Sequence, residues 1–340
     1  MLRGLHLGYS TSDYPRSEEP FLPLIDLPLP DLEQYSGRNP KPADHAAYWD
    51  RAMSEMRAVD PRAELVPAAF QTSFAECFHL YFTGVRGARV HAKYLRPRGS
   101  RARHAALLEF HGYSGQSGDF ATKLAWVANG FVVASLDCRG QGGMSEDTGG
   151  VRGTTLNGHI VRGLGDDPDK LLFRDIFLDT AELASIVLGM PEVDPERLGA
   201  RGASQGGGLT LACAALEPRV KRAAPVYPFL CDYQRVWEMD LAEGAYFELK
   251  EFFRRHDPTH EHAAEWFRRL GYIDVQHLAP RIRGEVLMAV GLMDRICPPS
   301  TQFAAYNQIE SKKARVIYPD FAHENLPGWF DREFEFLSGL

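Results

Sequence analysis

The sequence predicts an α/β fold in which a mainly parallel sheet of eight strands has helices on both faces and a helical insertion before its late strands. Eight strand-like apolar segments can be distinguished in the 340 residues, and most of the later ones alternate with helical patterns, as is typical of parallel sheets. A hydrophobic content of 44% can supply a large buried core. The eight segments are Phe78–Val85, Val90–Leu95, Ala105–Phe110, Phe131–Leu136, Leu198–Gly202, Arg222–Val226, Val286–Gly291 and Arg315–Tyr318.

The segments around these strands refine the prediction. Only Arg86-Gly87-Ala88-Arg89 separates the first two strands, so we expect them to form an antiparallel hairpin at one edge of the sheet. A proline-acid start and regularly spaced apolar residues predict an amphipathic surface helix over Pro42–Met56. The segments Gly207–Leu216 and Asp175–Met190 also favour helix, and the second should cover the sheet.

The stretch between Val226 and Val286 is too long for a simple crossover, whose loops usually span a few residues. We therefore interpret Cys231–Ile282, which has aromatic and acidic residues at helical spacing, as an insertion. Two roles are open for it: a lid or oligomer contact near a functional site, or simple packing on the sheet. Residues 21–340 are predicted to form one domain, with residues 1–20 as an N-terminal extension.

A serine between a strand and a helix is the main functional signal. The run Gly202-Ala203-Ser204-Gln205-Gly206 follows a short strand-like stretch and opens into a helix-favouring segment. A serine on such a sharp turn needs small neighbours, because the backbone there is strained and larger side chains would collide. With the helix N-terminus offering unpaired N–H groups, Ser204 is a candidate nucleophile for acyl transfer; the alternative is a glycine-rich helix entry without catalysis.

Two downstream residues supply the partners that such a serine needs, in the order serine, acid, histidine that α/β-hydrolases use. Asp294 follows the apolar strand that ends near Gly291, and His323 follows the strand that ends near Tyr318. Taken alone, Asp294 could be a solvated turn residue, and His323 could be a helix-capping or core histidine. Their joint occurrence after late strands predicts a candidate triad of Ser204, Asp294 and His323.

A fourth element is the strand that runs into His111-Gly112-Tyr113, a place where α/β-hydrolases supply a second N–H donor to the oxyanion. The predicted donors are the backbone N–H groups of Tyr113 and Gln205. His111 is interpreted as a residue that shapes the loop and not as the base.

Three separated stretches resemble the signatures of carbohydrate esterase family seven, the acetyl xylan esterases and cephalosporin C deacetylases. They are Arg139-Gly140-Gln141-Gly142 for R-G-Q, Gly202 to Gly206 for G-x-S-Q-G, and His323-Glu324 for H-E. The resemblance covers nearly the whole chain after about residue 20. It implies a cytoplasmic α/β-hydrolase that removes acetyl groups from small oligosaccharides and related esters, usually as a hexamer with active sites facing an internal cavity.

The same resemblance implies that the triad is Ser204, Asp294 and His323, with Tyr113 and Gln205 as oxyanion donors. It assigns a supporting role to Arg139, Gly140, Gln141 and Glu324. A planar arginine fork can hold a carboxylate or two loop carbonyls, although an exposed salt bridge at Arg139 would contribute less than about 1 kcal/mol.

Composition excludes several other classes of protein. A net charge of −7 without a basic block disfavours nucleic acid or an anionic membrane as partner, and no apolar run approaches the length of a membrane span. The five cysteines form no C-x-x-C pair and are expected to be reduced, in keeping with a cytoplasmic protein. Histidines 256, 260 and 262 are a weak metal motif because Pro258 interrupts the helix, so we expect neither metal nor cofactor.

Two alternatives to a deacetylase remain open at this level. The triad fixes acyl transfer but not the acyl group, so the chain could hydrolyse other acyl esters, amides or peptides. It could also be a non-catalytic binding module of the same fold, which an intact triad disfavours.

Overall fold

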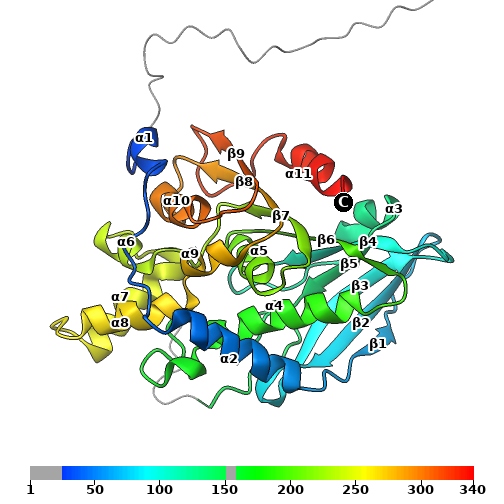
Figure 1. Cartoon of the computed structure of the whole chain (residues 1–340), viewed down its shortest axis with the longest axis horizontal. Coiled ribbons are helices and arrows are strands. Elements are labelled where there is room, and N and C mark those ends of the chain that lie inside the picture. Colours follow the sequence, from blue (N-terminus) through cyan, green and yellow to red (C-terminus); the bar gives the residue numbers. More distant parts are fainter. Residues whose placement is uncertain (1–24, 151–157) are drawn as a thin grey trace, which may run out of the picture.

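A single mixed sheet organises the molecule (Figure 1). The computed structural model describes residues 25–150 and 158–340, and the expected N-terminal extension, residues 1–20, lies outside them. Within the described residues the sheet has nine strands in the order β1-β2-β3-β5-β4-β6-β7-β8-β9. The strands are β1 (Glu64–Pro67), β2 (Ala75–Thr83), β3 (Arg89–Pro97), β4 (His104–Phe110), β5 (Val132–Leu136), β6 (Val193–Ala203), β7 (Val220–Val226), β8 (Glu285–Gly291) and β9 (Lys313–Tyr318).

Most of the sheet is parallel, as predicted. Strands β5, β4, β6, β7, β8 and β9 pair in parallel, whereas β1, β2, β3 and β5 pair antiparallel. The expected hairpin is confirmed as β2 and β3, whose register runs from the pair Ala75 and Pro97 to the pair Thr83 and Arg89.

The predicted number of eight strands is wrong by one, because the eight segments correspond to β2 through β9 and β1 was missed. Strand β1 has four residues, three of them exposed, and ends in Pro67. Such a segment lacks the alternation of buried and exposed residues that marks a strand in a sequence.

Helices cover both faces of the sheet. Helices α2, α4, α5, α9 and α10 lie on one face, while α3 and α11 lie on the other (Figure 1). Alternate residues of β4 point to opposite faces of the sheet. Ala106 and Leu108 pack on the side of α4 and α5, and Ala105 and Leu107 pack on the side of α3 and α11. The helices outside the insertion are α1 (Leu29–Leu32), α2 (His45–Ala58), α3 (Leu124–Ala128), α4 (Leu172–Leu188), α5 (Gln205–Leu216), α10 (Pro299–Asn307) and α11 (Trp329–Ser338).

The long segment between β7 and β8 is helical. It contains α6 (Tyr233–Glu238), α7 (Phe247–His256), α8 (Ala263–Leu270) and α9 (Val275–Leu278), joined by short 3-10 turns. Its aromatic side chains pack mainly on one another, as where Trp237 contacts the rings of Phe253 and Phe267. Among the described residues, no helix combines the length and apolar character needed to cross a membrane.

All five cysteines are buried and none is disulfide-bonded, in agreement with the reduced state expected from their number. Burial raises the pKa of every one of these thiols above its ordinary value.

Helix α4 carries a buried carboxyl group that should make stability depend on pH. Glu182 is 4% exposed, and its Oε2 has no hydrogen-bond partner among the described residues. Burial, followed by the charge of Asp179, raises its pKa to about 8, while Arg139 opposes the shift. The folded-state pKa therefore exceeds the unfolded value, and stability should fall as pH rises from about 4.5 through 8. We expect Glu182→Gln to unfold at a higher temperature than the parent at pH 9 but at the same temperature near pH 5.

The matched control is Glu335→Gln, because Glu335 is exposed on α11. It should shift the melting temperature at neither pH. If Glu182→Gln were equally stabilising at pH 5 and pH 9, ionisation of Glu182 would not be the cause.

Candidate active site

Ser204 lies on a strained turn between β6 and α5. Its φ and ψ are 58° and −121°, a region that costs a non-glycine residue conformational energy. A Cβ at Gly202 would lie 2.5 Å from the carbonyl oxygen of Gly206, and a Cβ at Gly206 would collide with the carbonyl oxygen of Phe110. The two glycines are therefore required by the close approach of β4 to this turn.

The loops after β8 and β9 bring the predicted acid and histidine together. Nδ1 of His323 lies 2.8 Å from Oδ2 of Asp294, and the other oxygen of Asp294 accepts hydrogen bonds of 2.8 Å from the N–H groups of Ile296 and Cys297. Asp294 is fully buried, whereas His323 is partly accessible. With Nδ1 facing a buried carboxylate, the ring holds its proton at Nδ1 and leaves Nε2 available to accept another.

Cys297 connects this pair to the serine. Its Sγ, an oxygen of Asp294 and a ring nitrogen of His323 all lie within 4.8 Å of one another. Burial raises the pKa of the Cys297 thiol well above its ordinary value, against the opposing effect of the neighbouring Ser204 hydroxyl. Sequence reasoning gave Cys297 no role, since a buried cysteine has no pattern that distinguishes a site residue from a core residue.

The ring of Tyr227 packs against the imidazole of His323, with ring centroids 4.5 Å apart. This contact restricts the orientation of the histidine ring. Sequence reasoning included Tyr227 in the family likeness but gave it no role in the site. Glu324 accepts a hydrogen bond of 3.1 Å from the N–H of Ala322 and so closes the loop that presents His323.

The loop after β4 is fixed by the insertion. The Tyr113 hydroxyl donates to Glu248 on α7 and accepts from the N–H of His159 at 2.8 Å, and Glu248 also accepts from the N–H of Val161 at 3.0 Å. The Tyr113 ring packs edge-on against Phe229. Sequence reasoning missed Glu248, which lies 135 positions from Tyr113.

Gln205, the second predicted oxyanion donor, opens α5. As the first residue of the helix, it has a backbone N–H that no carbonyl within the helix can accept. Its buried side chain exchanges two hydrogen bonds, of 2.9 and 3.0 Å, with Gln141. The R-G-Q segment thus contacts the helix that begins at the serine.

Arg139 is buried, so the alternative of an exposed salt bridge at this position is wrong. Its Nε and Nη2 bind the two oxygens of Asp179 at 2.5 and 2.6 Å, and Nη1 donates to the carbonyl of Val85 at 3.0 Å. Gly140 has a φ of +64°, which allows the chain to turn after the arginine. The pair therefore anchors the R-G-Q segment to α4.

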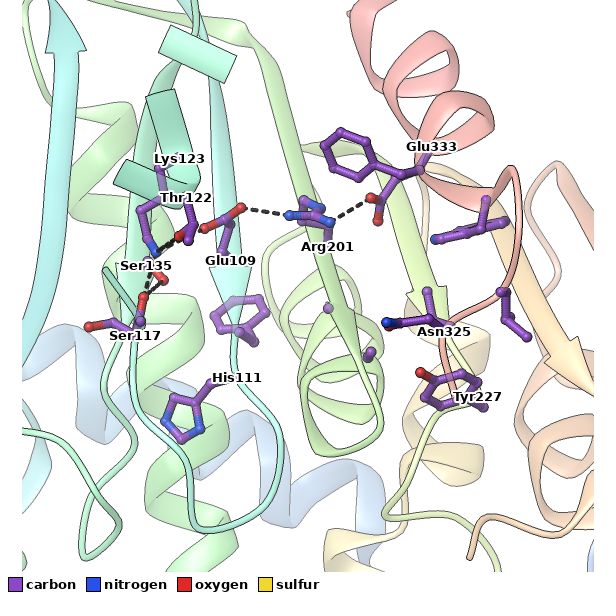
Figure 2. Close-up of a pocket in the computed structure, with 18 of the residues that line it drawn as sticks. Glu109, His111, Ser117, Thr122, Lys123, Ser135, Arg201, Tyr227, Asn325 and Glu333 are labelled. Atoms are coloured by element: carbon purple, nitrogen blue, oxygen red, sulfur yellow. Dashed lines mark hydrogen bonds and ion pairs between the residues drawn. The ribbon is translucent and has the colours of Figure 1, made fainter. Parts of the chain in front are cut away.

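Two cavities border these residues. One, of about 560 Å³, is lined by Tyr113, His159, Arg162 and Glu248 together with Phe247 of the insertion. The other, of about 480 Å³, lies between α3 and α11 and reaches Gly202, Ala203 and Tyr227 (Figure 2). Both volumes are in the range of small-molecule sites.

We expect Glu248→Gln to lower kcat about tenfold or more with little change in KM for a small ester, because a misplaced Tyr113 N–H would weaken the transition state more than the ground state. Initial-rate measurements over a range of ester concentrations test this. Glu251→Gln, on the same helix and paired with Arg254 and Arg255, is the matched control and should leave kcat unchanged. Equal kcat in both variants would remove any positioning role from Glu248.

A serine on a strained strand-to-helix turn, with an Asp–His pair on the loops after two later parallel strands, defines the α/β-hydrolase class. Comparison with known proteins gives the family. The model for the acetyl xylan esterase family matches residues 22–340, so the chain belongs to the acetyl xylan esterase family and is a carboxylic ester hydrolase.

Solved structures agree with this assignment. The chain is 59% identical to acetyl xylan esterase 1 from Thermoanaerobacterium sp. JW/SL YS485, with a TM-score of 0.92 over 93% of this chain and 99% of that one. It is 34% identical to an acetyl xylan esterase from Paenibacillus sp. R4, with a TM-score of 0.88 over 92% and 99% of the two chains.

A curated relative is the acetyl esterase Axe7A of Xylanibacter ruminicola, which is 27% identical over 202 residues. The match covers 58% of this chain and 44% of Axe7A, so the chain spans less than half the length of that relative.

Proposed function

We propose that the protein is a serine esterase that removes acetyl groups from acetylated xylo-oligosaccharides and related small esters, such as cephalosporin C, through an acyl-serine intermediate. The observation that carries the proposal is the Asp294–His323 hydrogen bond of 2.8 Å, together with a serine held at a positive φ on the turn that opens α5. The names of two similar solved structures support acetylated xylan as the substrate class.

In the first step, Ser204 Oγ attacks the acetyl carbonyl while Nε2 of His323 takes its proton. The buried Asp294 carboxylate stabilises the imidazolium that forms. The negative charge on the carbonyl oxygen is then stabilised by the backbone N–H groups of Tyr113 and Gln205. His323 returns the proton to the departing sugar oxygen, and an acetyl-serine and a free hydroxyl group result.

In the second step, His323 takes a proton from water, whose oxygen attacks the acetyl-serine carbonyl. Collapse of the intermediate returns the proton to Ser204 and releases acetate. Every proton is transferred through His323, so this chemistry needs the chain's own residues and water.

The test is steady-state hydrolysis of 4-nitrophenyl acetate, butyrate and octanoate beside acetylated xylo-oligosaccharides and cephalosporin C. We expect a steep fall in kcat/KM from acetate to butyrate and serine-dependent release of acetate from the sugar. Preference for longer chains would keep the nucleophile and overturn the substrate class.

We further propose that the esterase acts in the cytoplasm as a hexamer, as the family resemblance implies and as its five reduced cysteines suit. Light scattering at micromolar concentration tests the assembly, and a monomer would contradict it.

A further inference from the structure

The peptide group between Gly112 and Tyr113 carries one of the two proposed oxyanion donors, and residues that the proposed chemistry does not use control its orientation. The described residues contain no cis peptide bond, and in a trans peptide the carbonyl and the N–H point in opposite directions. The Gly112 carbonyl lies 2.7 Å from Nδ1 of His111 and accepts a hydrogen bond of 3.0 Å from the N–H of Gly115. The Tyr113 N–H has no acceptor among the described residues, so it is available to an oxyanion.

Two backbone groups hold the imidazole of His111 in a single tautomer. The Gly112 carbonyl can only accept, so Nδ1 carries the hydrogen. Nε2 lies 3.0 Å from the backbone nitrogen of Cys138, whose N–H can only donate, so Nε2 keeps its lone pair. Burial lowers the pKa of His111 below its ordinary value, against the opposing effects of the Gly112 carbonyl and Asp137, and so favours this neutral form. His111 is therefore a hydrogen-bond donor aimed at the Gly112 carbonyl.

The residue after β5 holds the other end of the same loop (Figure 2). Oδ1 of the buried Asp137 accepts a hydrogen bond of 2.6 Å from the N–H of Ser117, and Oδ2 accepts one of 3.0 Å from the N–H of Met144. Nδ1 of the buried His91 on β3 lies 2.6 Å from Oδ2. Burial raises the pKa of Asp137, but hydrogen bonds from His91 and the two N–H groups outweigh it and hold the pKa well below its ordinary value. Asp137 is thus an ionised clamp between this loop and the R-G-Q segment.

The R-G-Q segment also contacts the middle of the loop and the start of α5. The N–H of Gly142 donates to the carbonyl of Gly115 at 2.9 Å, and a Cβ at Gly142 would lie 2.9 Å from the same oxygen. Gln141 joins the segment to Gln205, the residue that carries the second proposed donor. A single segment therefore contacts both the loop that carries Tyr113 and the helix that begins at Gln205.

We propose that His111 and Asp137 are positioning residues that hold the loop of residues 111–117 near its two ends, so that the Tyr113 N–H faces the oxyanion. The inference rests on the proposed esterase function and explains how one of its donors is aimed. Gly112 has no side chain to restrain the peptide, and a flipped peptide would present the Gly112 carbonyl oxygen to the negative charge. The hydrogen bond from His111 opposes this flip and polarises the peptide group, which strengthens the Tyr113 N–H as a donor.

The first test compares three replacements of His111 by steady-state hydrolysis of 4-nitrophenyl acetate. Asparagine can place an amide N–H near the position of Nδ1 and so donate to Gly112. Glutamine can place its amide oxygen near the position of Nε2 and accept from Cys138 without donating to Gly112, and phenylalanine can do neither. We expect kcat to fall about tenfold or more in His111→Gln and His111→Phe with KM nearly unchanged, and to fall less in His111→Asn.

His104 provides the matched control, because it lies at the opposite end of β4 and also has both ring nitrogens occupied. Its Nδ1 lies 2.8 Å from the carbonyl of Gly130, and its Nε2 lies 2.8 Å from Oγ of Ser100. His104→Phe removes hydrogen bonds of the same kind far from the loop along the strand, so it should leave kcat and KM unchanged. If His111 only stabilised the fold, His111→Phe would likewise lower the melting temperature and keep the parental kcat in assays well below that temperature.

The contribution of Asp137 is tested with a double variant. Asp137→Asn leaves one acceptor oxygen for two N–H groups and should lower kcat about fivefold or more. Because both residues hold the same loop, kcat of the protein with His111→Gln and Asp137→Asn should fall by less than the product of the two single losses. His91→Gln, which removes the imidazole donor to Asp137 and leaves the carboxylate, takes the place of Asp137→Asn if that variant does not fold.

Serine-dependent hydrolysis with kcat in the order parent, His111→Asn, His111→Gln supports the inference. Parental kcat in all three His111 variants, or a lower kcat in His111→Asn than in His111→Gln, overturns the role of His111 and leaves the esterase intact. A raised KM with parental kcat places His111 in substrate binding and also overturns it. A double variant whose loss equals the product of the single losses overturns the shared action on one loop. Absence of serine-dependent hydrolysis of any ester overturns the proposed function itself.

Discussion

Replacing Ser204 by alanine should lower kcat for 4-nitrophenyl acetate by about 10⁴-fold or more, because removal of the nucleophile leaves only the oxyanion donors and binding. The fold should persist, since the backbone strain at φ 58° is imposed by the packing of β4, β6 and α5 and not by the hydroxyl group. Hydrolysis rates, with circular dichroism of the same preparation, test both parts.

Gln141→Ala is a useful comparison, because it removes the hydrogen bonds between Gln141 and Gln205 and leaves the nucleophile in place. It should reduce kcat far less than Ser204→Ala. A serine-directed phosphonate should label the parent protein and not the alanine variant. An alanine variant with near-parental rates would end the assignment of Ser204 as nucleophile.

The second large effect is expected at Arg139. Replacing it by methionine removes both hydrogen bonds to Asp179, which is fully buried, and leaves that carboxylate without a cation in contact among the residues that the structure describes. Breaking a buried pair from one side costs about 3–5 kcal/mol, so the free energy of unfolding should fall by that amount. Urea or thermal unfolding followed by fluorescence measures it.

Two controls separate burial from simple loss of charge. Arg255→Met breaks an exposed pair with Glu251 and should cost less than about 1 kcal/mol. The double variant Arg139→Met with Asp179→Leu removes both charges and should recover part of the lost stability. If Arg139→Met cost no more than Arg255→Met, the pair would not anchor the R-G-Q segment.

The elements with strong local patterns were predictable. Strands such as β4, β5 and β8 contain apolar runs of ordinary length, and the turn at Ser204 is constrained by glycines that lie within two residues of it. Short-range sterics and hydrophobic periodicity determine these features, so a single sequence is enough to predict them. Helix α2 was expected at Pro42–Met56 and extends over His45–Ala58, a difference usual for helix ends.

The features that were missed depend on contacts distant in the sequence. Glu248 reaches Tyr113 across 135 positions, and Glu333 reaches Arg201 across 132. A glutamate on an amphipathic helix has the same pattern whether it faces solvent or a buried arginine. Arg139 illustrates this ambiguity: the sequence left a surface salt bridge open, and only the packing of α4 against the segment after β5 shows that the pair is buried.

The burial of all five thiols makes the native protein well suited to site-specific labelling. A thiol reacts through its thiolate, so buried cysteines with raised pKa values should resist maleimide reagents at neutral pH. One cysteine introduced at Arg254, whose side chain is 71% exposed on α7, would then carry a fluorophore alone. The insertion could be followed by fluorescence in this way without first removing any natural cysteine, Cys297 beside the serine included.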